Sequence, residues 1–267
     1  MFIVDLFEQQ QTKQLKKLVI MPGGFHPWHP GHSSLYASAK KAFPDADVYV
    51  VSTNDTSTRP FPFDVKRQLA VMAGVPADHF VQVKSPFQSR EVVSNYDSAN
   101  TVLIFVRSQK DSNEPPVPGV IKKNGEPGYL QPYNASTNIQ PMNRHGYIAY
   151  LPTVEFKAGR TGITGATQIR EAWPNADAEV KKAIVQDLYP KIAQNDNIIQ
   201  KVIRLLDHAL GSVNESAGVG VIANKSQIHD PRYSTSITQD VGPGTLKKNL
   251  DAFALSGPRN KKSRNKK

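Results

Sequence analysis

The sequence predicts an α/β protein with a parallel β-sheet, helices on both faces of that sheet, additional C-terminal helices and an extended basic tail. Short apolar runs alternate with amphipathic segments over the first 106 residues, which is typical of successive strand–helix–strand units. Within each run the apolar residues are continuous rather than alternating with polar ones, as in strands buried on both faces of a parallel sheet.

Short apolar runs bounded by turn residues predict the strands. Lys17–Pro22 is closed by a proline and two glycines, and Thr101–Val106 is bulky and apolar throughout. The other predicted strands are Asp47–Ser52, Phe80–Val83 and Tyr147–Phe156.

Apolar residues at helical spacing predict helices between and after these strands. The segment His32–Phe43 has this spacing and ends before Pro44. Helices are also predicted for Asp64–Ala73, Gln88–Tyr96, Thr167–Trp173 and Ala178–Leu210, the last interrupted at Pro190. The apolar stripe of that last segment either packs on its own domain or supports a homo-oligomer.

The pattern divides the chain into a leader (1–16), a Rossmann-like domain (17–175), C-terminal helices (176–210) and an extended or disordered tail (211–267). Within the domain, residues 108–146 are rich in Pro, Asn, Gly and Gln and are too many for an ordinary connection. We expect this insertion to be a lid, a substrate loop or a surface excursion.

Composition narrows the class of protein. The 267 residues include no cysteine, which excludes disulfides and thiolate metal sites. No apolar run approaches the roughly 18 residues of a membrane span, so we expect a cytoplasmic protein without membrane contact. The net charge of +10 comes mostly from residues 211–267, which hold ten basic and four acidic residues. This tail is either a solvated terminus or a contact for nucleic acid.

The turn after the first strand carries the clearest chemical signal. Glycines such as Gly24 and Gly31 let a ligand approach the backbone, and the following helix offers free N–H groups to an anion. His29 and His32 straddle the start of that helix, so both can donate hydrogen bonds to phosphates. Lys40, about two turns into the helix, has a stem that we expect to reach back towards a phosphate.

A His-x-x-His pair also suggests a metal site. No third ligand follows at the spacing of a zinc site, so we predict no protein-held metal here.

The run Gly24-Phe-His-Pro-Trp-His-Pro-Gly-His32 resembles the GxFxPxHxGH signature of the HxGH-type nucleotidyltransferase superfamily, whose cytidylyltransferases continue as Gly31 to Lys40 does here. Further along, Arg160-Thr-Gly-Ile-Thr-Gly-Ala-Thr-Gln-Ile-Arg170 resembles the family's ISSTxIR motif, with Thr164 where an aliphatic residue is usual. The resemblance covers about Lys17 to Trp173 and implies that the fold brings the two motifs together.

The resemblance implies transfer of AMP or CMP from ATP or CTP to a phosphorylated small molecule, with release of pyrophosphate and without a covalent enzyme intermediate. It implies catalytic roles for His29, His32 and Arg170, with Mg²⁺ carried by the nucleotide. The nucleotide-binding residues would be Gly24, Phe25, Gly31, Lys40 and Thr167, the last also as helix N-cap.

Arg107 and Asp111 follow the strongest strand, where relatives of this family bind the acceptor. The segment Arg59–Arg67 follows the second strand and is expected to be structural. The base is undecided, because Lys40 favours CTP and the Gly165-Ala-Thr-Gln-Ile-Arg run favours adenylyltransferases of the nicotinamide mononucleotide or phosphopantetheine type.

The chain also resembles nucleotidyltransferase-like proteins of T-even-like tailed phages, and Leu6-Phe7-Glu8 resembles a prohead-protease cleavage site, so a virion form would begin at Gln9. That resemblance places the protein in the infected host's cytoplasm or packaged in the virion. The alternative function is a catalytically silent virion-associated or nucleic-acid-associated protein. An aminoacyl-tRNA-synthetase-like enzyme would need a KMSKS-like loop, which the sequence lacks.

Overall fold

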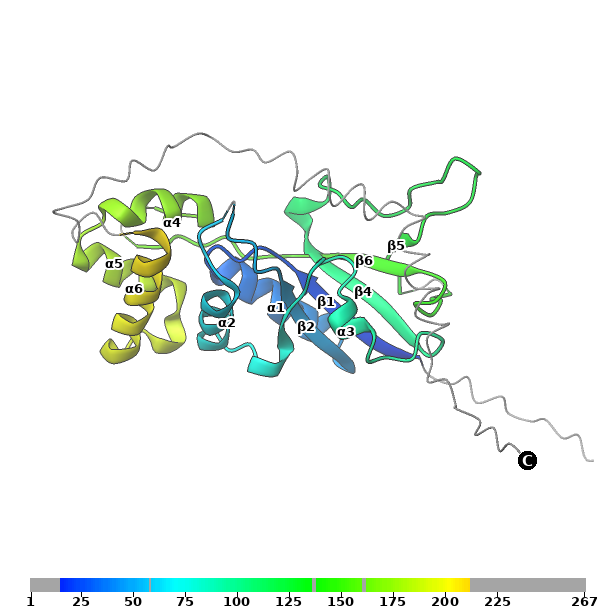
Figure 1. Cartoon of the computed structure of the whole chain (residues 1–267), viewed down its shortest axis with the longest axis horizontal. Coiled ribbons are helices and arrows are strands. Elements are labelled where there is room, and N and C mark those ends of the chain that lie inside the picture. Colours follow the sequence, from blue (N-terminus) through cyan, green and yellow to red (C-terminus); the bar gives the residue numbers. More distant parts are fainter. Residues whose placement is uncertain (1–14, 58, 136–137, 160–161, 212–267) are drawn as a thin grey trace, which may run out of the picture.

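The computed structural model describes residues 15–57, 59–135, 138–159 and 162–211, and shows a six-stranded parallel sheet flanked by helices (Figure 1). The strand order is β3-β2-β1-β4-β6-β5, and every neighbouring pair is parallel. The strands are β1 Lys16–Pro22, β2 Ala46–Ser52, β3 Phe80–Gln82, β4 Thr101–Ser108, β5 Leu130–Pro132 and β6 Gly146–Leu151. The predicted α/β, Rossmann-like class is confirmed.

The α-helices lie close to their predicted positions. They are α1 Pro30–Ala42, α2 Phe63–Met72, α3 Arg90–Val93, α4 Ala166–Ala172, α5 Ala178–Leu188 and α6 Asp196–Leu210. Short 3₁₀ turns occupy Ala77–His79, Gln109–Asp111, Trp173–Asn175 and Pro190–Ile192. The break predicted at Pro190 is therefore real, because a proline has no N–H to continue the helix.

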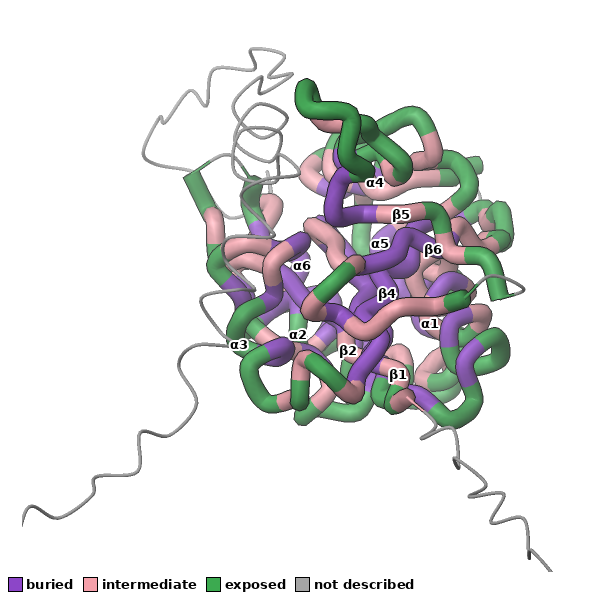
Figure 2. Tube along the Cα trace, turned by 90° about the vertical axis from the view of Figure 1, so that its right-hand side faces the viewer, coloured by how far each residue is buried: buried purple, intermediate pink, exposed green. Residues whose placement is uncertain are grey.

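Alternate residues of the strands build two cores, one on each face of the sheet. The strands are largely buried, as the tube coloured by burial shows (Figure 2). Val19 and Met21 of β1 face a large core that includes residues of α1, α2, α4, α5 and α6. Leu18 and Ile20 face a smaller core with Val93 of α3 and parts of the insertion. Burial on both faces explains why the strand sequences are apolar throughout.

The structure differs from the predicted elements at three places. The helix predicted over Gln88–Tyr96 is regular only at Arg90–Val93. The insertion contains β5, an edge strand that pairs with β6. The strand predicted over Tyr147–Phe156 ends at Leu151, because the chain then leaves the sheet and crosses α1, where the Pro152 carbonyl accepts a hydrogen bond of 3.1 Å from Ser38 Oγ.

The C-terminal helices belong to the same large core as the sheet. Ile199, Val202 and Leu206 of α6 are fully buried in it, so the apolar stripe packs on its own domain. Asp207 accepts hydrogen bonds from Trp173 Nε1 at 3.0 Å and from Lys181 Nζ at 2.7 Å, which ties α6 to the segments before it. Of the two predicted alternatives, the buried part of the stripe therefore fits packing on its own domain.

Residues 1–14 of the predicted leader and residues 212–267 of the predicted tail lie outside the described residues, and with them the cleavage site after Glu8. Lys16, which was predicted to end the leader, is the first residue of β1. Within the described ranges, no helix combines the length and apolar character needed to cross a membrane.

Candidate active site

A cavity of about 830 Å³ opens where the strand order changes direction, at the carboxyl ends of β1 and β4. The turn after β1 forms one wall, with Gly24, His29 and His32. The loops after β4 and β6 form the other walls, with Asp111 and Phe156 among the lining residues. In open parallel sheets this is the place where ligands bind, and the volume suits a nucleotide-sized molecule.

The turn after β1 is held by close packing around Phe25. Phe25 has a left-handed backbone with φ of 55°, and its buried ring packs against Trp28, with ring centroids 5.0 Å apart. A Cβ at Gly23 would lie 2.5 Å from Phe25 Cζ, so only glycine fits beneath that ring. Trp28 is itself held in place, because its carbonyl accepts a hydrogen bond of 2.9 Å from Tyr189 Oη. Helices remote in sequence thus fix the turn.

His29 and His32 use the same ring nitrogen to begin α1. His29 is the N-cap, and its Nδ1 accepts the backbone N–H of Gly31 at 3.2 Å. His32 Nδ1 accepts the backbone N–H of His29 at 3.3 Å. In a neutral imidazole with Nδ1 as acceptor, the proton is on Nε2. Both Nε2–H groups are therefore available as donors to a ligand.

Both histidines are uncharged at neutral pH. Burial lowers the pKa of His29 from 6.5 to about 4, and burial followed by the proximity of His29 and His26 lowers that of His32 well below 6.5. Their rings stack with centroids 3.7 Å apart, and Phe156 stacks on the other side of His29 at 5.1 Å. Two positively charged rings at this spacing would repel each other. The stacked arrangement of His29 and His32 therefore favours two neutral rings, which can act as hydrogen-bond donors.

The second sequence motif meets the first through Arg170 of α4. Its Nη1 donates a hydrogen bond of 2.6 Å to the carbonyl of His26, which is 144 residues away in the chain. Its Nη2 donates to Thr167 Oγ1 at 3.0 Å. The N-cap of α4 is Gly165, not Thr167, and the exposed Thr167 lies in the first helical turn as a partner of Arg170. Thr164 of this motif lines the cavity, whereas Thr167 and Arg170 are not among its lining residues.

Lys40 does not reach the site. It lies at the exposed end of α1 and is not among the residues that line the cavity. An α-helix rises about 1.5 Å per residue, so the ten residues from Pro30 carry Lys40 about 15 Å away from the turn. The prediction that its stem reaches back to a phosphate does not match this placement.

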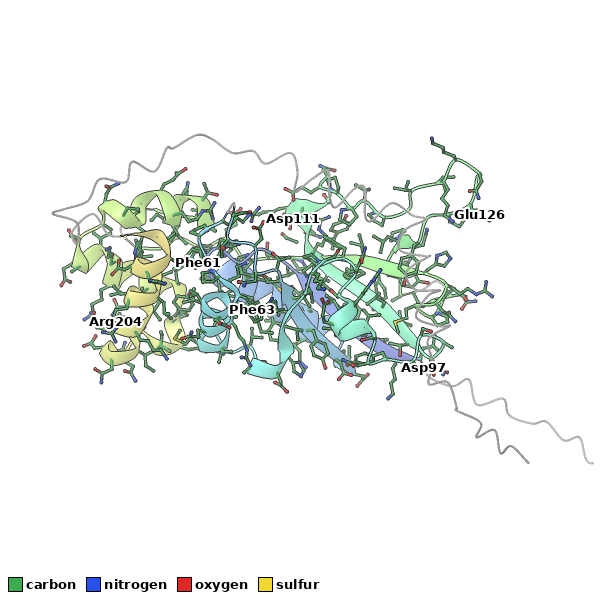
Figure 3. All side chains as sticks on the ribbon, viewed as in Figure 1. Phe61, Phe63, Asp97, Asp111, Glu126 and Arg204 are labelled. Atoms are coloured by element: carbon green, nitrogen blue, oxygen red, sulfur yellow. The ribbon has the colours of Figure 1, made fainter. Side chains whose placement is uncertain are left out.

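Arg107 and Asp111 both line the cavity, but the Arg107 guanidinium is engaged by its own chain. Nη1 donates to the carbonyls of Glu114 at 2.7 Å and Pro116 at 3.2 Å, and the group lies 5.6 Å from the Phe87 ring centroid. Arg107 therefore fixes the start of the insertion. Asp111 stands above the end of β4, whereas Glu126 lies far out on the insertion (Figure 3).

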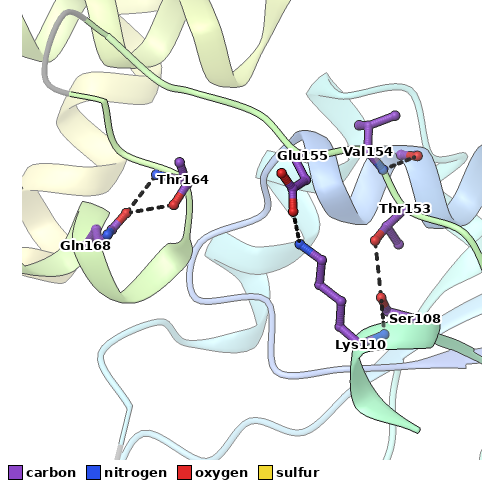
Figure 4. A network of polar contacts seen from close by, with 8 residues as sticks. Ser108, Lys110, Thr153, Val154, Glu155, Thr164 and Gln168 are labelled. Carbon is purple, nitrogen blue, oxygen red and sulfur yellow. Dashed lines mark hydrogen bonds and ion pairs between the residues drawn. The ribbon is translucent and has the colours of Figure 1, made fainter.

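Two polar contacts join the loops after β4 and β6 beside the cavity (Figure 4). Ser108 Oγ and Thr153 Oγ1 lie 3.1 Å apart. Lys110 Nζ and Glu155 Oε1 form an exposed ion pair of 3.0 Å. All four residues line the cavity, so this wall carries both signs of charge.

The structure adds basic residues that the sequence motifs did not indicate. Arg59 lines the cavity, and a Cβ at Gly24 would lie 2.6 Å from its Nη1. Burial, followed by the charges of Lys66, Arg59 and Arg170, lowers the pKa of His26 to about 2. We expected the Arg59–Arg67 segment to be structural. Its basic character is the one feature of its sequence that could have indicated a role at the cavity.

Comparisons with known proteins give the following result. No family model and no curated protein matches the sequence. Among solved structures, the chain is similar to the nicotinic acid mononucleotide adenylyltransferase of Plasmodium falciparum complexed with APC, at 11% sequence identity and a TM-score of 0.37. That match covers 69% of this chain and 98% of the other.

Proposed function

We propose that the chain is a nucleotidyltransferase that transfers an AMP or CMP group from ATP or CTP to a phosphate-bearing small molecule and releases pyrophosphate. The observation that carries this proposal is the hydrogen bond from Arg170 to the His26 carbonyl. It brings a guanidinium to the turn in which His29 and His32 each keep an Nε2–H free. Such donors suit the charge that grows on a phosphoryl group in the transition state.

In the proposed reaction, an oxygen of the acceptor phosphate attacks the α-phosphorus of the nucleotide and forms a new P–O bond. The bond from the α-phosphorus to the bridging oxygen breaks in line, and its electron pair leaves with pyrophosphate. A phosphate monoester is already largely ionised near neutral pH, so the step needs no general base. This agrees with the lowered pKa values of the two histidines, which keep them as neutral donors.

The residues divide between the two substrates. His29 and His32 would bind the α- and β-phosphates, and Arg170 with Thr167 would hold the triphosphate. Gly24 and Gly31 leave room for the phosphates, and Phe25 supports the turn from below. Mg²⁺ would arrive with the nucleotide. The acceptor would occupy the wall that carries Asp111, with Arg107 holding that wall in place.

The test is pyrophosphate release with Mg-ATP or Mg-CTP against nicotinamide mononucleotide, phosphopantetheine and simple phosphomonoesters. We expect release with one nucleotide and one acceptor class, and a loss of about 100-fold or more in kcat/KM for His32→Ala. His208→Ala, at an exposed position on α6, is the matched control and should retain full activity.

Absence of release with both nucleotides across the whole panel would favour the alternative, a catalytically silent protein that associates with a virion or with nucleic acid. The observation behind this alternative is the charge of residues 211–267, ten basic against four acidic.

A further inference from the structure

Lys66, in the first half of α2, is a buried basic residue that the proposed reaction does not use. Lys66 is 0% exposed, and in the view of Figure 1 its helix lies between the sheet and α6. Phe61 and Phe63, just before it in the chain, are also buried. Burying a lysine is costly unless the charge is paired, and none of the ion pairs between described residues includes Lys66.

The ammonium of Lys66 is aimed at the end of β2. Its Nζ donates to the Thr53 carbonyl at 2.9 Å and lies 3.4 Å from Ser52 Oγ. Ser52 Oγ in turn lies 3.5 Å from the carbonyl oxygen of Gly24. A chain of polar contacts thus connects Lys66 to the turn after β1, where we place the phosphates.

The groups around Lys66 are mostly cationic. Burial, and then the charge of Arg59, lowers the pKa of Lys66 to about 8, while Asp55 acts in the opposite direction. The charges of Lys66, Arg59 and Arg170 all lower the pKa of His26, so these groups lie within electrostatic reach of one another. His26 is 4% exposed, and its Nδ1 has no hydrogen-bond partner among the described residues. Positive charge is thus concentrated on the buried Lys66, the half-buried Arg170 and the exposed Arg59, and such a concentration favours an anion nearby.

We propose that Lys66 is a positioning residue for an anion subsite beside Gly24, where Arg59 and Arg170 contact the terminal phosphates of the triphosphate or the released pyrophosphate. Lys66 fixes the end of β2 and adds positive charge beneath the subsite, while the neutral His26 presents its carbonyl to Arg170. The inference rests on the proposed function for the identity of the anion. It goes beyond that function by assigning a role to a residue outside both sequence motifs.

Binding of inorganic pyrophosphate, measured by calorimetry, tests this subsite without requiring turnover. We expect Lys66→Met to weaken pyrophosphate binding by about tenfold or more, because a neutral chain of similar shape removes the charge and, with it, the hydrogen bond to the Thr53 carbonyl. Lys66→Arg should restore binding to within about threefold. Lys181→Met is the control, because Lys181 is another buried lysine but is paired with Asp207 at 2.7 Å. It should lower the melting temperature and leave pyrophosphate affinity unchanged.

A second measurement uses the unaltered protein and decides the matter if Lys66→Met does not fold. Carbon-13 NMR of lysine-labelled protein follows the titration of the Lys66 ammonium with and without pyrophosphate. An anion nearby favours the charged form, so pyrophosphate should raise the pKa of Lys66, in opposition to burial and to Arg59. The charged groups that face it in both titrations are Arg59, Asp55 and Arg170, together with the neutral His26.

Each result has a definite meaning. A folded Lys66→Met variant with unchanged pyrophosphate affinity, or a Lys66 pKa that does not rise on binding, would overturn the inference. If pyrophosphate binding depends on Lys66 but no nucleotide supports turnover, the subsite stands and the proposed transfer reaction fails. If turnover occurs and Lys66→Met leaves pyrophosphate binding intact, the reaction stands and the subsite fails.

Discussion

His29 and His32 perform two tasks with different nitrogen atoms. Each Nδ1 accepts a backbone N–H at the start of α1, at 3.2 and 3.3 Å, and this leaves each Nε2–H to a ligand. Helix capping therefore determines the tautomer that the proposed chemistry needs. The same burial that keeps both rings neutral has a cost in stability at acid pH.

The first prediction concerns that cost. The pKa of His29 is about 4 in the folded chain and 6.5 in the unfolded one. Between these values the unfolded state holds a proton that the folded state lacks, so stability falls as pH decreases through this window. One such group contributes at most about 1.4 kcal/mol per pH unit. His29→Asn keeps a capping acceptor and should flatten the decline measured by urea unfolding.

In the same experiment, His208→Asn should leave the decline in stability unchanged, because His208 is exposed. Equal slopes for His29→Asn and the unaltered protein would show that His29 does not lose its proton on folding, and the neutral-donor assignment would then be wrong.

Gly23 has no room for a side chain beside the Phe25 ring. Its Cβ in Gly23→Ala would lie 2.5 Å from Phe25 Cζ and 2.6 Å from Phe25 Cε1. The Phe25 ring is 3% exposed and has little room to move, so overpacking should cost about 1–3 kcal/mol of stability. Thermal or urea unfolding measures this cost. A variant as stable as the unaltered protein would show that the Phe25 ring can shift.

At the scale of elements, the turn after β1 depends on segments far along the chain. Tyr189, at the end of α5, donates its buried hydroxyl to the Trp28 carbonyl at 2.9 Å. Tyr189→Phe leaves that carbonyl without its partner and should cost about 1–3 kcal/mol in urea unfolding. Tyr36→Phe, on a partly exposed face of α1, is the control. Equal losses for both variants would argue against this anchoring contact.

The insertion should depend on Arg107 in a similar way. Arg107→Met removes the donors to the Glu114 and Pro116 carbonyls, at 2.7 and 3.2 Å. We expect faster proteolytic cleavage within residues 108–146 than in the unaltered protein, with the sheet core still protected. An unchanged cleavage rate would mean that other contacts are sufficient to hold the insertion.

Most elements could be predicted from the sequence because burial on both faces makes parallel strands apolar throughout. β5 was missed because Leu130–Pro132 has three residues and ends in a proline, so no local pattern distinguishes it from a loop. The two motifs were recognisable, but Lys66 was not. Its importance arises from burial and from the contacts at the end of β2, which are set by tertiary packing.

In the whole molecule, positive charge is concentrated in two separate places. Arg59, Lys66 and Arg170 lie within electrostatic reach of His26 in the turn after β1, whereas residues 211–267 supply ten of the 33 basic residues of the chain. Shortening the chain after Gly211 should leave pyrophosphate binding unchanged, because the anion subsite lies within the fold. Calorimetry measures this, and a large loss of affinity would show that residues beyond Gly211 contribute to the site.

The same shortened chain addresses the nucleic-acid alternative. If residues 212–267 contact DNA or RNA, their removal should weaken binding of duplex DNA at low salt and reduce its dependence on salt concentration. Equal binding by both chains would remove the support that the tail gives to this alternative.

We propose that His29, His32 and Arg170 form one phosphate-binding site. A crystal structure with Mg²⁺ and the α,β-methylene analogue of the active nucleotide tests it most directly. We predict phosphate oxygens within about 3.2 Å of both Nε2 atoms and of the Arg170 guanidinium. A nucleotide bound elsewhere, or one bound here with either histidine rotated so that Nδ1 faces the phosphates, would contradict the claim.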